Sequence, residues 1–278
     1  MVQIAREDLQ PVLESHRGNA ALEAAVEGSV SNERALLSVL GRYIQFNGAF
    51  GPGLANLSGE IAACQGLFRD RAEPVEVIAD RAAEVASDFF HAAVDEYDDR
   101  ATPWRDTHRT LAQACLKGMA AYYGYEAQRL NEILVVNKST HDAMARVFEG
   151  YGIGAKLEDQ RLFAGMGFHA GSEVLADQEF TIIDKVLRER LPEMVKALTD
   201  MRVRVGSAPE QHKAYYWISI HTSVEADHFD SAVQGVNKAL SYYVGKNDPQ
   251  TVKDWILRGF ADFARVQADF MAGLSSSS

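Results

Sequence analysis

The chain has 278 residues, of which 47% are hydrophobic and 24% charged, a composition typical of a folded globular protein with one large core. Its formal net charge of −11 leaves no broad basic surface, so neither nucleic acid nor an anionic membrane is expected as a partner. No stretch of about 18 uncharged apolar residues occurs, and the N-terminus lacks a secretory pattern. The only two cysteines, Cys64 and Cys115, cannot form a disulfide framework or a Cys-rich zinc site. We therefore expect a soluble, cytoplasmic protein.

Helical periodicity dominates the chain, and most of the seven prolines fall where one helix would give way to the next. We predict helices at about 5–15, 33–48, 53–69, 75–97, 107–124, 126–136, 140–150, 158–199, 210–243 and 250–273. Asp248 before Pro249 predicts an N-cap, and the Ser-Thr-His-Asp sequence at 139–142 resembles a capping box. The only strand-like piece, 202–205, is expected to be too short to build a sheet. The predicted fold class is all-α.

The most informative segment is H-T-S-V-E-A-D-H, which places His221, Glu225 and His228 on one stripe of a helix. At about 100° per residue, Glu225 is offset from His221 by roughly 40° and His228 by roughly 20°. Ile218 and Ala232 continue this stripe on either side, so the three ionisable groups interrupt an apolar line that should face a core. Because burying these groups is costly and a divalent cation is the usual compensation, the stripe predicts a metal site.

Three further ligand-type residues have apolar neighbours on their own helix faces and are therefore expected to point inward. Glu96 follows Phe89 by two turns, His108 is followed by apolar residues one and two turns later, and Glu173 shares its face with Phe180. The resulting set of three carboxylates and three imidazoles is Glu96, His108, Glu173, His221, Glu225 and His228. Such a set suits a pair of first-row metal ions, and its lack of thiolates argues against purely structural zinc.

This set resembles that of the haem-oxygenase-like diiron oxidases and oxygenases. In that family one central helix supplies His-x3-(Asp or Glu)-x2-His, a second supplies a lone Glu, and a third region supplies a Glu and a His at variable spacing. In this sequence those roles would fall to the 221–228 segment, to Glu173, and to Glu96 with His108. The resemblance covers about residues 75–273 of a single helical domain, 1–278, that ends in a Ser-rich tail at 275–278.

The resemblance implies a haem-oxygenase-like helical bundle that binds two iron ions per chain and uses O2 as co-substrate, with manganese open as a replacement for one iron. It implies an amino acid or amine-bearing small molecule as substrate, and N-oxygenation, desaturation, oxidative C–C cleavage or nitrile formation as the reaction in natural-product biosynthesis. A homodimer is expected. The pocket would be lined by Phe89, Phe180 and Ile218, with Arg161 or Lys213 available to hold a substrate carboxylate.

Two ligand assignments have rivals. Glu84 and His91 share a stripe and could replace Glu96 and His108, but acidic residues on the same line favour a solvated face. Glu126, in Y-Y-G-Y-E-A-Q, competes with Glu173 because aromatic-rich Y-x-Y-E-x-Q segments also occur around this ligand in members of the family.

The other histidines are expected to have no ligand role. We predict that His169 packs beside the site, and that His141 and His212 are exposed. Three other kinds of protein remain open. A metal-free enzyme of the same fold, thiaminase-like or a cofactorless oxidase, would have Cys115 as its candidate nucleophile. A ferritin-like diiron protein would need a second Glu-x-x-His motif, and a helical interaction protein would need no metal.

Overall fold

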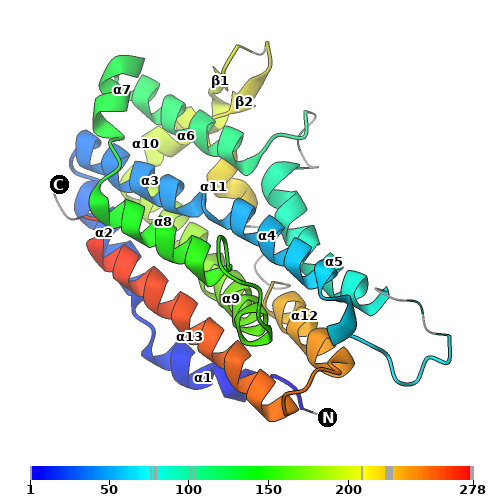
Figure 1. The fold of residues 1–278 in the computed structure, drawn as a ribbon. Coiled ribbons are helices and arrows are strands. Elements are labelled where there is room, and N and C mark those ends of the chain that lie inside the picture. The colour runs from blue at the N-terminus through cyan, green and yellow to red at the C-terminus, as the bar shows by residue number, and fades with distance from the viewer. Residues whose placement is uncertain are drawn as a thin grey trace.

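The computed structural model describes residues 2–75, 77, 80–99, 102, 104–207, 209–222 and 228–275, without the side chains of 176, 177 and 228–232. These residues are mostly helical, which confirms the predicted all-α class (Figure 1). The helices are α1 (Arg6–Ser15), α2 (Gly18–Ser29), α3 (Glu33–Asn47), α4 (Phe50–Ala63), α5 (Asp80–Tyr97), α6 (His108–Tyr122), α7 (Ala127–Ile133), α8 (Lys138–Gly150), α9 (Asp159–Arg190), α10 (Pro192–Asp200), α11 (Tyr216–His221), α12 (His228–Tyr242) and α13 (Pro249–Gly273). A 3-10 turn, η1 (Gln65–Leu67), and two strands, β1 (Arg202–Arg204) and β2 (Gln211–Lys213), complete the described elements.

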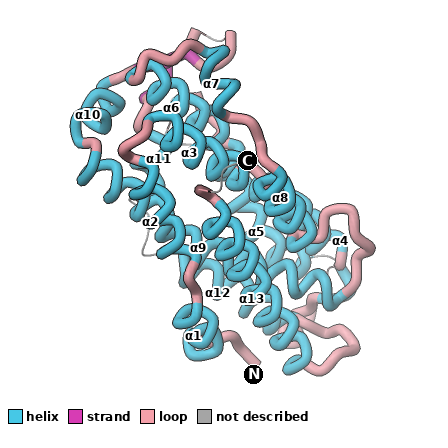
Figure 2. The backbone as a smooth tube through the Cα atoms, turned by 90° about the vertical axis from the view of Figure 1, so that its left-hand side faces the viewer, coloured by secondary structure: helices cyan, strands magenta, loops and turns pink. Residues whose placement is uncertain are grey.

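The long helices α9 and α13 pack against each other along the centre of the bundle. Their backbones touch at two glycines: a Cβ atom added at Gly167 or Gly259 would lie 1.9 Å from a carbonyl oxygen of the opposite helix. Only glycine permits this approach. Around this pair lie α2, α4, α8, α11 and α12, with α1 against one end of α13 and α10 at the far end of α9 (Figure 2).

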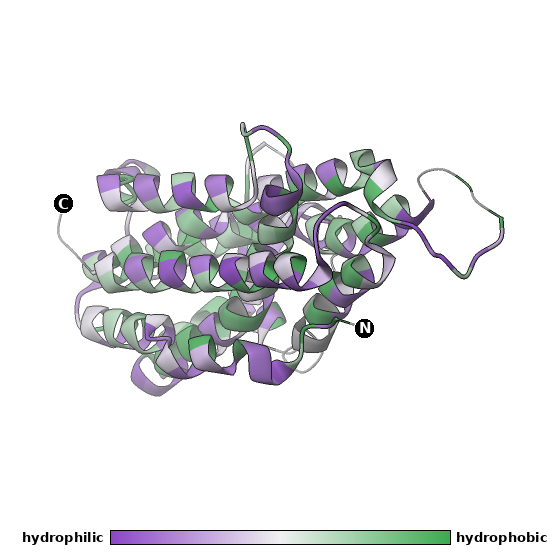
Figure 3. Ribbon diagram, turned by 60° about the horizontal axis from the view of Figure 1, so that its bottom comes forward, coloured by the Kyte–Doolittle hydropathy of each residue, from purple (hydrophilic) through white to green (hydrophobic). Residues whose placement is uncertain are grey.

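Hydrophilic and hydrophobic residues alternate along the helices (Figure 3), as expected for helices with one apolar side. The buried hydrophobic side chains of the described residues form one cluster that reaches from Ile4 to Leu274. Neither cysteine in this part of the chain forms a disulfide, and Cys115 is buried in α6. Among the described residues, no helix is long and apolar enough to cross a membrane.

Several predicted boundaries were wrong. The helix predicted at 158–199 is broken at Leu191, because Pro192 has no amide hydrogen to donate and starts α10 instead. The helix predicted at 210–243 is interrupted as well, since residues 211–213 form β2 and α11 ends at His221. Helix α2 was not predicted.

The strand-like piece at 202–205 does form a sheet, contrary to the prediction. Arg202–Arg204 pairs antiparallel with Gln211–Lys213, so a partner close in the chain compensates for the short length. His212, predicted to be exposed, is buried in β2, and its Nδ1 lies 3.0 Å from a carboxylate oxygen of Asp106. This hydrogen bond joins the hairpin to the loop before α6.

One helix cap was predicted correctly and one was not. The Asp248 side chain accepts a hydrogen bond from Gln250 N at 3.0 Å, with Pro249 in the first turn of α13. Helix α8 instead begins at Lys138, and its cap is Asn137, which accepts from Thr140 N at 2.8 Å. His141 is exposed, as predicted.

Candidate metal centre

Glu96 and His108 meet where α5 ends and α6 begins. Two residues between them, Asp99 and Asp106, are joined by a hydrogen bond from Asp99 N to Asp106 O at 2.8 Å. Thr107 caps α6 by accepting from a backbone amide, which places His108 at the first helical position. Glu96 Oε1 then lies 3.4 Å from His108 Nδ1, with side chains 22% and 15% exposed. Residues that are 12 positions apart in the sequence thus form one mostly buried pair.

This pair could hold a metal ion. His108 Nδ1 is buried and has no hydrogen-bond partner of good geometry among the described residues. Two ligands at about 2.1 Å from one ion lie about 3.0–3.4 Å apart for angles near 90–110°, which matches the observed separation. Burial alone would lower the pKa of His108, but Glu96, with smaller contributions from Asp99 and Asp95, raises it above its ordinary value. The site therefore attracts positive charge to His108, as a proton or as a metal ion.

His221 lies directly beside His108. The two ring centroids are 4.7 Å apart, and the rings are inclined at 70°. His221 Nδ1 donates a hydrogen bond to the carbonyl oxygen of Trp217 at 2.7 Å, which fixes the ring's lone pair on Nε2. An imidazole that donates one N–H to a backbone carbonyl is the usual arrangement of a metal-binding histidine.

Glu173 approaches the same region from α9. Its Oε1 is 3.7 Å from Nδ1 of His169, one turn earlier. The His169 ring is buried against Phe89 of α5, with centroids 5.4 Å apart, and burial lowers its pKa. Burial raises the pKa of the Tyr151 hydroxyl, and the charges of Glu173 and Glu96 raise it further. Because both carboxylates act on one hydroxyl, they lie around a common part of the core.

The two remaining predicted ligands, Glu225 and His228, have no described side chain. Glu225 lies outside the described residues, and His228 begins α12 but its side chain is outside them too. The structure thus brings Glu96, His108 and His221 together, with Glu173 nearby. Among the side chains that the structure describes, no group of three or more His, Cys, Asp or Glu residues is arranged to hold a metal ion.

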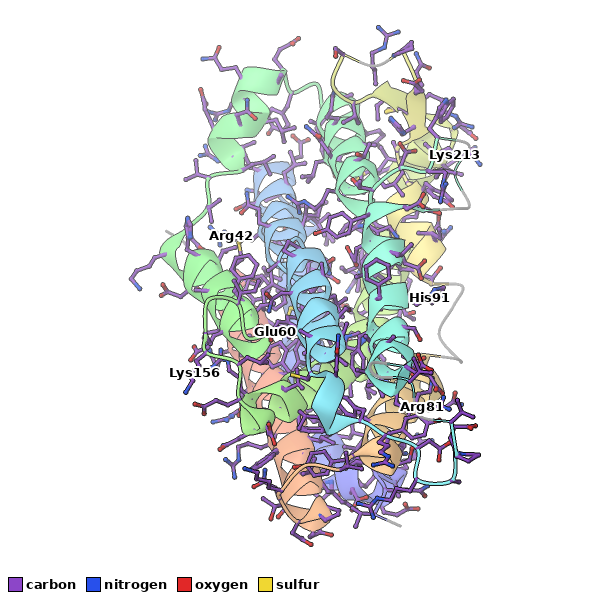
Figure 4. The ribbon with its side chains drawn as sticks, turned by 45° about the vertical axis from the view of Figure 1, so that its right-hand side comes forward. Arg42, Glu60, Arg81, His91, Lys156 and Lys213 are labelled. Atoms are coloured by element: carbon purple, nitrogen blue, oxygen red, sulfur yellow. The ribbon has the colours of Figure 1, made fainter. Side chains whose placement is uncertain are left out.

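The rival ligands point elsewhere. Glu84 forms an ion pair with Arg81 and accepts a hydrogen bond from Tyr242 at 3.1 Å. His91 is exposed on the outer side of α5, as Figure 4 shows. Glu126 is exposed at the start of α7.

The two cationic residues expected near the pocket have their contacts away from Glu96, His108 and His221. Arg161 donates to Glu149 O at 2.7 Å, beside the turn after α8, and Lys213 is exposed on the hairpin (Figure 4). Arg109, which follows His108, donates to Ile44 O and lines a surface hollow of about 320 Å³. The expected apolar lining residues, Phe89, Phe180 and Ile218, are all buried, and Phe180 stacks on His221.

Sequence reasoning missed the buried carboxylate of Glu179 in α9. It is 1% exposed and accepts hydrogen bonds from Tyr43 Oη, at 2.7 Å, and from Gln267 Nε2. Burial raises its pKa to about 7, against the smaller opposing effect of these two hydrogen bonds. The signal was present in the sequence, because Leu175 and Ile183 flank it at four-residue spacing.

No family model matches the chain, and a search of curated proteins found none with a similar sequence. The activity is therefore inferred from the site residues alone.

Proposed function

We propose that the protein is an O2-activating non-haem diiron oxidase or oxygenase with a haem-oxygenase-like helical bundle. The observation that carries this proposal is the convergence of Glu96, His108 and His221, from α5, α6 and α11, in a mostly buried place. Glu173 from α9, with Glu225 and His228, would complete the six ligands. Nitrogen and carboxylate donors of this kind suit iron or manganese.

The chain's own groups would prepare the site before any metal enters. The carbonyl of Trp217 orients His221 so that Nε2 carries the lone pair, while the Phe180 ring stacks on its face and limits rotation. Glu96 holds a proton or a cation at His108. Two Fe(II) ions would supply the electrons that reduce O2. The surrounding Phe89, Phe180 and Ile218 would keep water away from the reaction.

The substrate we propose is an amino acid or another amine-bearing small molecule, and the enzyme would work as a homodimer. The proposed reaction classes are N-oxygenation, desaturation, oxidative C–C cleavage and nitrile formation. The metal-free alternative is less well supported, because its nucleophile would be Cys115. Burial raises the pKa of this thiol to about 12, so the reactive thiolate is scarce at neutral pH.

The test is an anaerobic titration of metal-free protein with Fe(II), followed by rapid mixing with O2 in the presence of candidate amino acids. We expect two irons per chain and a transient long-wavelength absorption that one substrate class accelerates. His108→Ala should lower the iron count, whereas His91→Ala, an exposed histidine on α5, should leave it unchanged. Absence of iron binding at saturating substrate would refute the proposal, and loss of iron in His91→Ala would transfer the ligand role to Glu84 and His91.

A further inference from the structure

A phenol and a carboxylate are hydrogen-bonded inside the core, next to the candidate metal centre. Tyr43 of α3 is 0% exposed and donates its hydroxyl hydrogen to Glu179 Oε2 at 2.7 Å. The other carboxylate oxygen accepts from Gln267 of α13, which is also 0% exposed. The phenolic proton therefore has a basic acceptor within one hydrogen bond.

The charge of Glu179 has little else to offset it. Among the described residues the groups that act on it are the two hydrogen-bond donors, Tyr43 and Gln267, and no cation pairs with it. Arg42, on the same helix as Tyr43, donates instead to Leu274 O at 3.0 Å. His16, at the C-terminal end of α1, contacts Gln267, and burial lowers the pKa of the His16 imidazole. A negative charge in this position is costly, so any event that brings a proton to Glu179 relieves the cost.

Aromatic rings connect this pair to the candidate site. The Tyr43 ring centroid is 5.8 Å from that of Phe180 and 6.1 Å from that of Trp217. Phe180 stacks on His221, with centroids 4.0 Å apart and planes 11° from parallel. Trp217 is 6.1 Å from His221 as well. An electron leaving Tyr43 would cross a short, close-packed distance to reach the proposed ligands.

We propose that Tyr43 is a redox-active residue that gives one electron to an O2-derived oxidant at the candidate site while its phenolic proton moves to Glu179. The Tyr43 O–H bond breaks, a new O–H bond forms on Glu179 Oε2, and the electron reduces the oxidant by one. The products are a neutral phenoxyl radical and a neutral carboxylic acid. A one-electron donor of the thiol or reduced-flavin class then restores the pair, and the proton returns to Tyr43.

The environment favours this coupled step over simple ionisation. Burial raises the pKa of Tyr43 well above its ordinary value, so the phenol remains protonated at rest. Loss of the electron alone would leave a phenol radical cation in an apolar core. Transfer of the proton across one hydrogen bond avoids this charge and also removes the charge of Glu179. The identity of the oxidant depends on the proposed function, whereas the proton-coupled oxidation of Tyr43 is a property of the pair.

The test is flash photo-oxidation of the metal-free chain by an added photosensitiser and electron acceptor, with detection of tyrosyl radicals by electron paramagnetic resonance. We expect a slowly decaying tyrosyl signal that is lost in Tyr43→Phe, which removes only the hydroxyl. Glu179→Gln should shorten its lifetime, since it removes the proton acceptor. The matched control is Tyr215→Phe: Tyr215 also donates to a carboxylate, Asp184, at 2.8 Å, but that carboxylate is paired with Arg188. This control should keep the signal.

A signal that persists in Tyr43→Phe, or no slow signal in the unmodified chain, would overturn the inference. If Glu179→Gln does not fold, the lifetime of the tyrosyl signal in the unmodified chain is compared in H2O and D2O. A slower decay in D2O supports proton return from Glu179, and equal decay refutes it. Iron is absent from this experiment, so its outcome is independent of the iron titration. Failure of the metal assignment and failure of the Tyr43 assignment are thereby distinguished.

Discussion

His221 lies face to face with Phe180, with ring centroids 4.0 Å apart and planes inclined by only 11°. This stack joins α11 to α9 and holds the imidazole in place from one side, while the Trp217 carbonyl holds its Nδ1 from the other. The orientation of a proposed ligand is therefore fixed by neighbours that do not themselves bind metal.

Phe180→Leu should weaken iron binding because it removes the stacking surface but keeps an apolar side chain. We expect a stability loss of about 1–2 kcal/mol and a larger dissociation constant for Fe(II), measured by anaerobic titration. The matched control is Phe163→Leu, a buried phenylalanine of the same helix. It should cost similar stability and leave iron affinity unchanged. Equal effects on iron would show that Phe180 acts only through general packing.

Glu96→Gln should lower the pKa of His108 in the metal-free protein. Without the carboxylate, burial dominates and the pKa falls below the ordinary histidine value of about 6.5. In the unmodified protein the pKa of His108 is raised, so its contribution to stability is fully present at low pH and is lost as pH rises through that value. Titration of the histidine ring signals by nuclear magnetic resonance measures this. An unchanged pKa for His108 would show that the charge of Glu96 does not act on this imidazole.

Glu179→Gln should change how stability depends on pH. The pKa of Glu179 is about 7 in the folded state against 4.5 for the ordinary group, so the folded state binds more protons between these values. Its contribution is therefore present below pH 4.5 and lost as pH rises toward 7. The difference is on the order of 3 kcal/mol. Denaturant unfolding across this range should show a smaller decline in Glu179→Gln than in the unmodified chain, and parallel curves would contradict the raised pKa.

Gly259→Ala should destabilise the bundle by more than about 2 kcal/mol, because the new methyl group would overlap a backbone oxygen of α9 and force the central helices apart. Gly28→Ala is the control. Gly28 lies in α2 with nothing within 4 Å of the added atom, so alanine there should be neutral or stabilising by about 1 kcal/mol. Thermal unfolding compares the two, and equal midpoints would contradict the close packing of α9 on α13.

Local patterns predicted the helical class and the inward direction of Glu96 and His108, because apolar neighbours one and two turns away are visible in the sequence. They did not predict partners that are distant in the chain. His212 was expected to be exposed since its neighbours are polar, but it is buried, and its Nδ1 is hydrogen-bonded to Asp106, 106 residues earlier.

Glu179 was overlooked although Leu175 and Ile183 mark its helix face as apolar. Asp177 and Gln178 directly before it suggest a solvated residue, and its two hydrogen-bond donors lie 136 and 88 residues away. By contrast, the break at Pro192 depends on a local property of proline and could have been predicted from the sequence.

The most direct test of the central claim is an anomalous diffraction map, recorded at the iron absorption edge, from crystals grown anaerobically with Fe(II) and substrate. We predict two iron peaks, one at about 2.0–2.2 Å from both Glu96 and His108 and the second at a similar distance from His221 Nε2. Peaks located only at surface carboxylates, with His108 and His221 unliganded, would contradict the account.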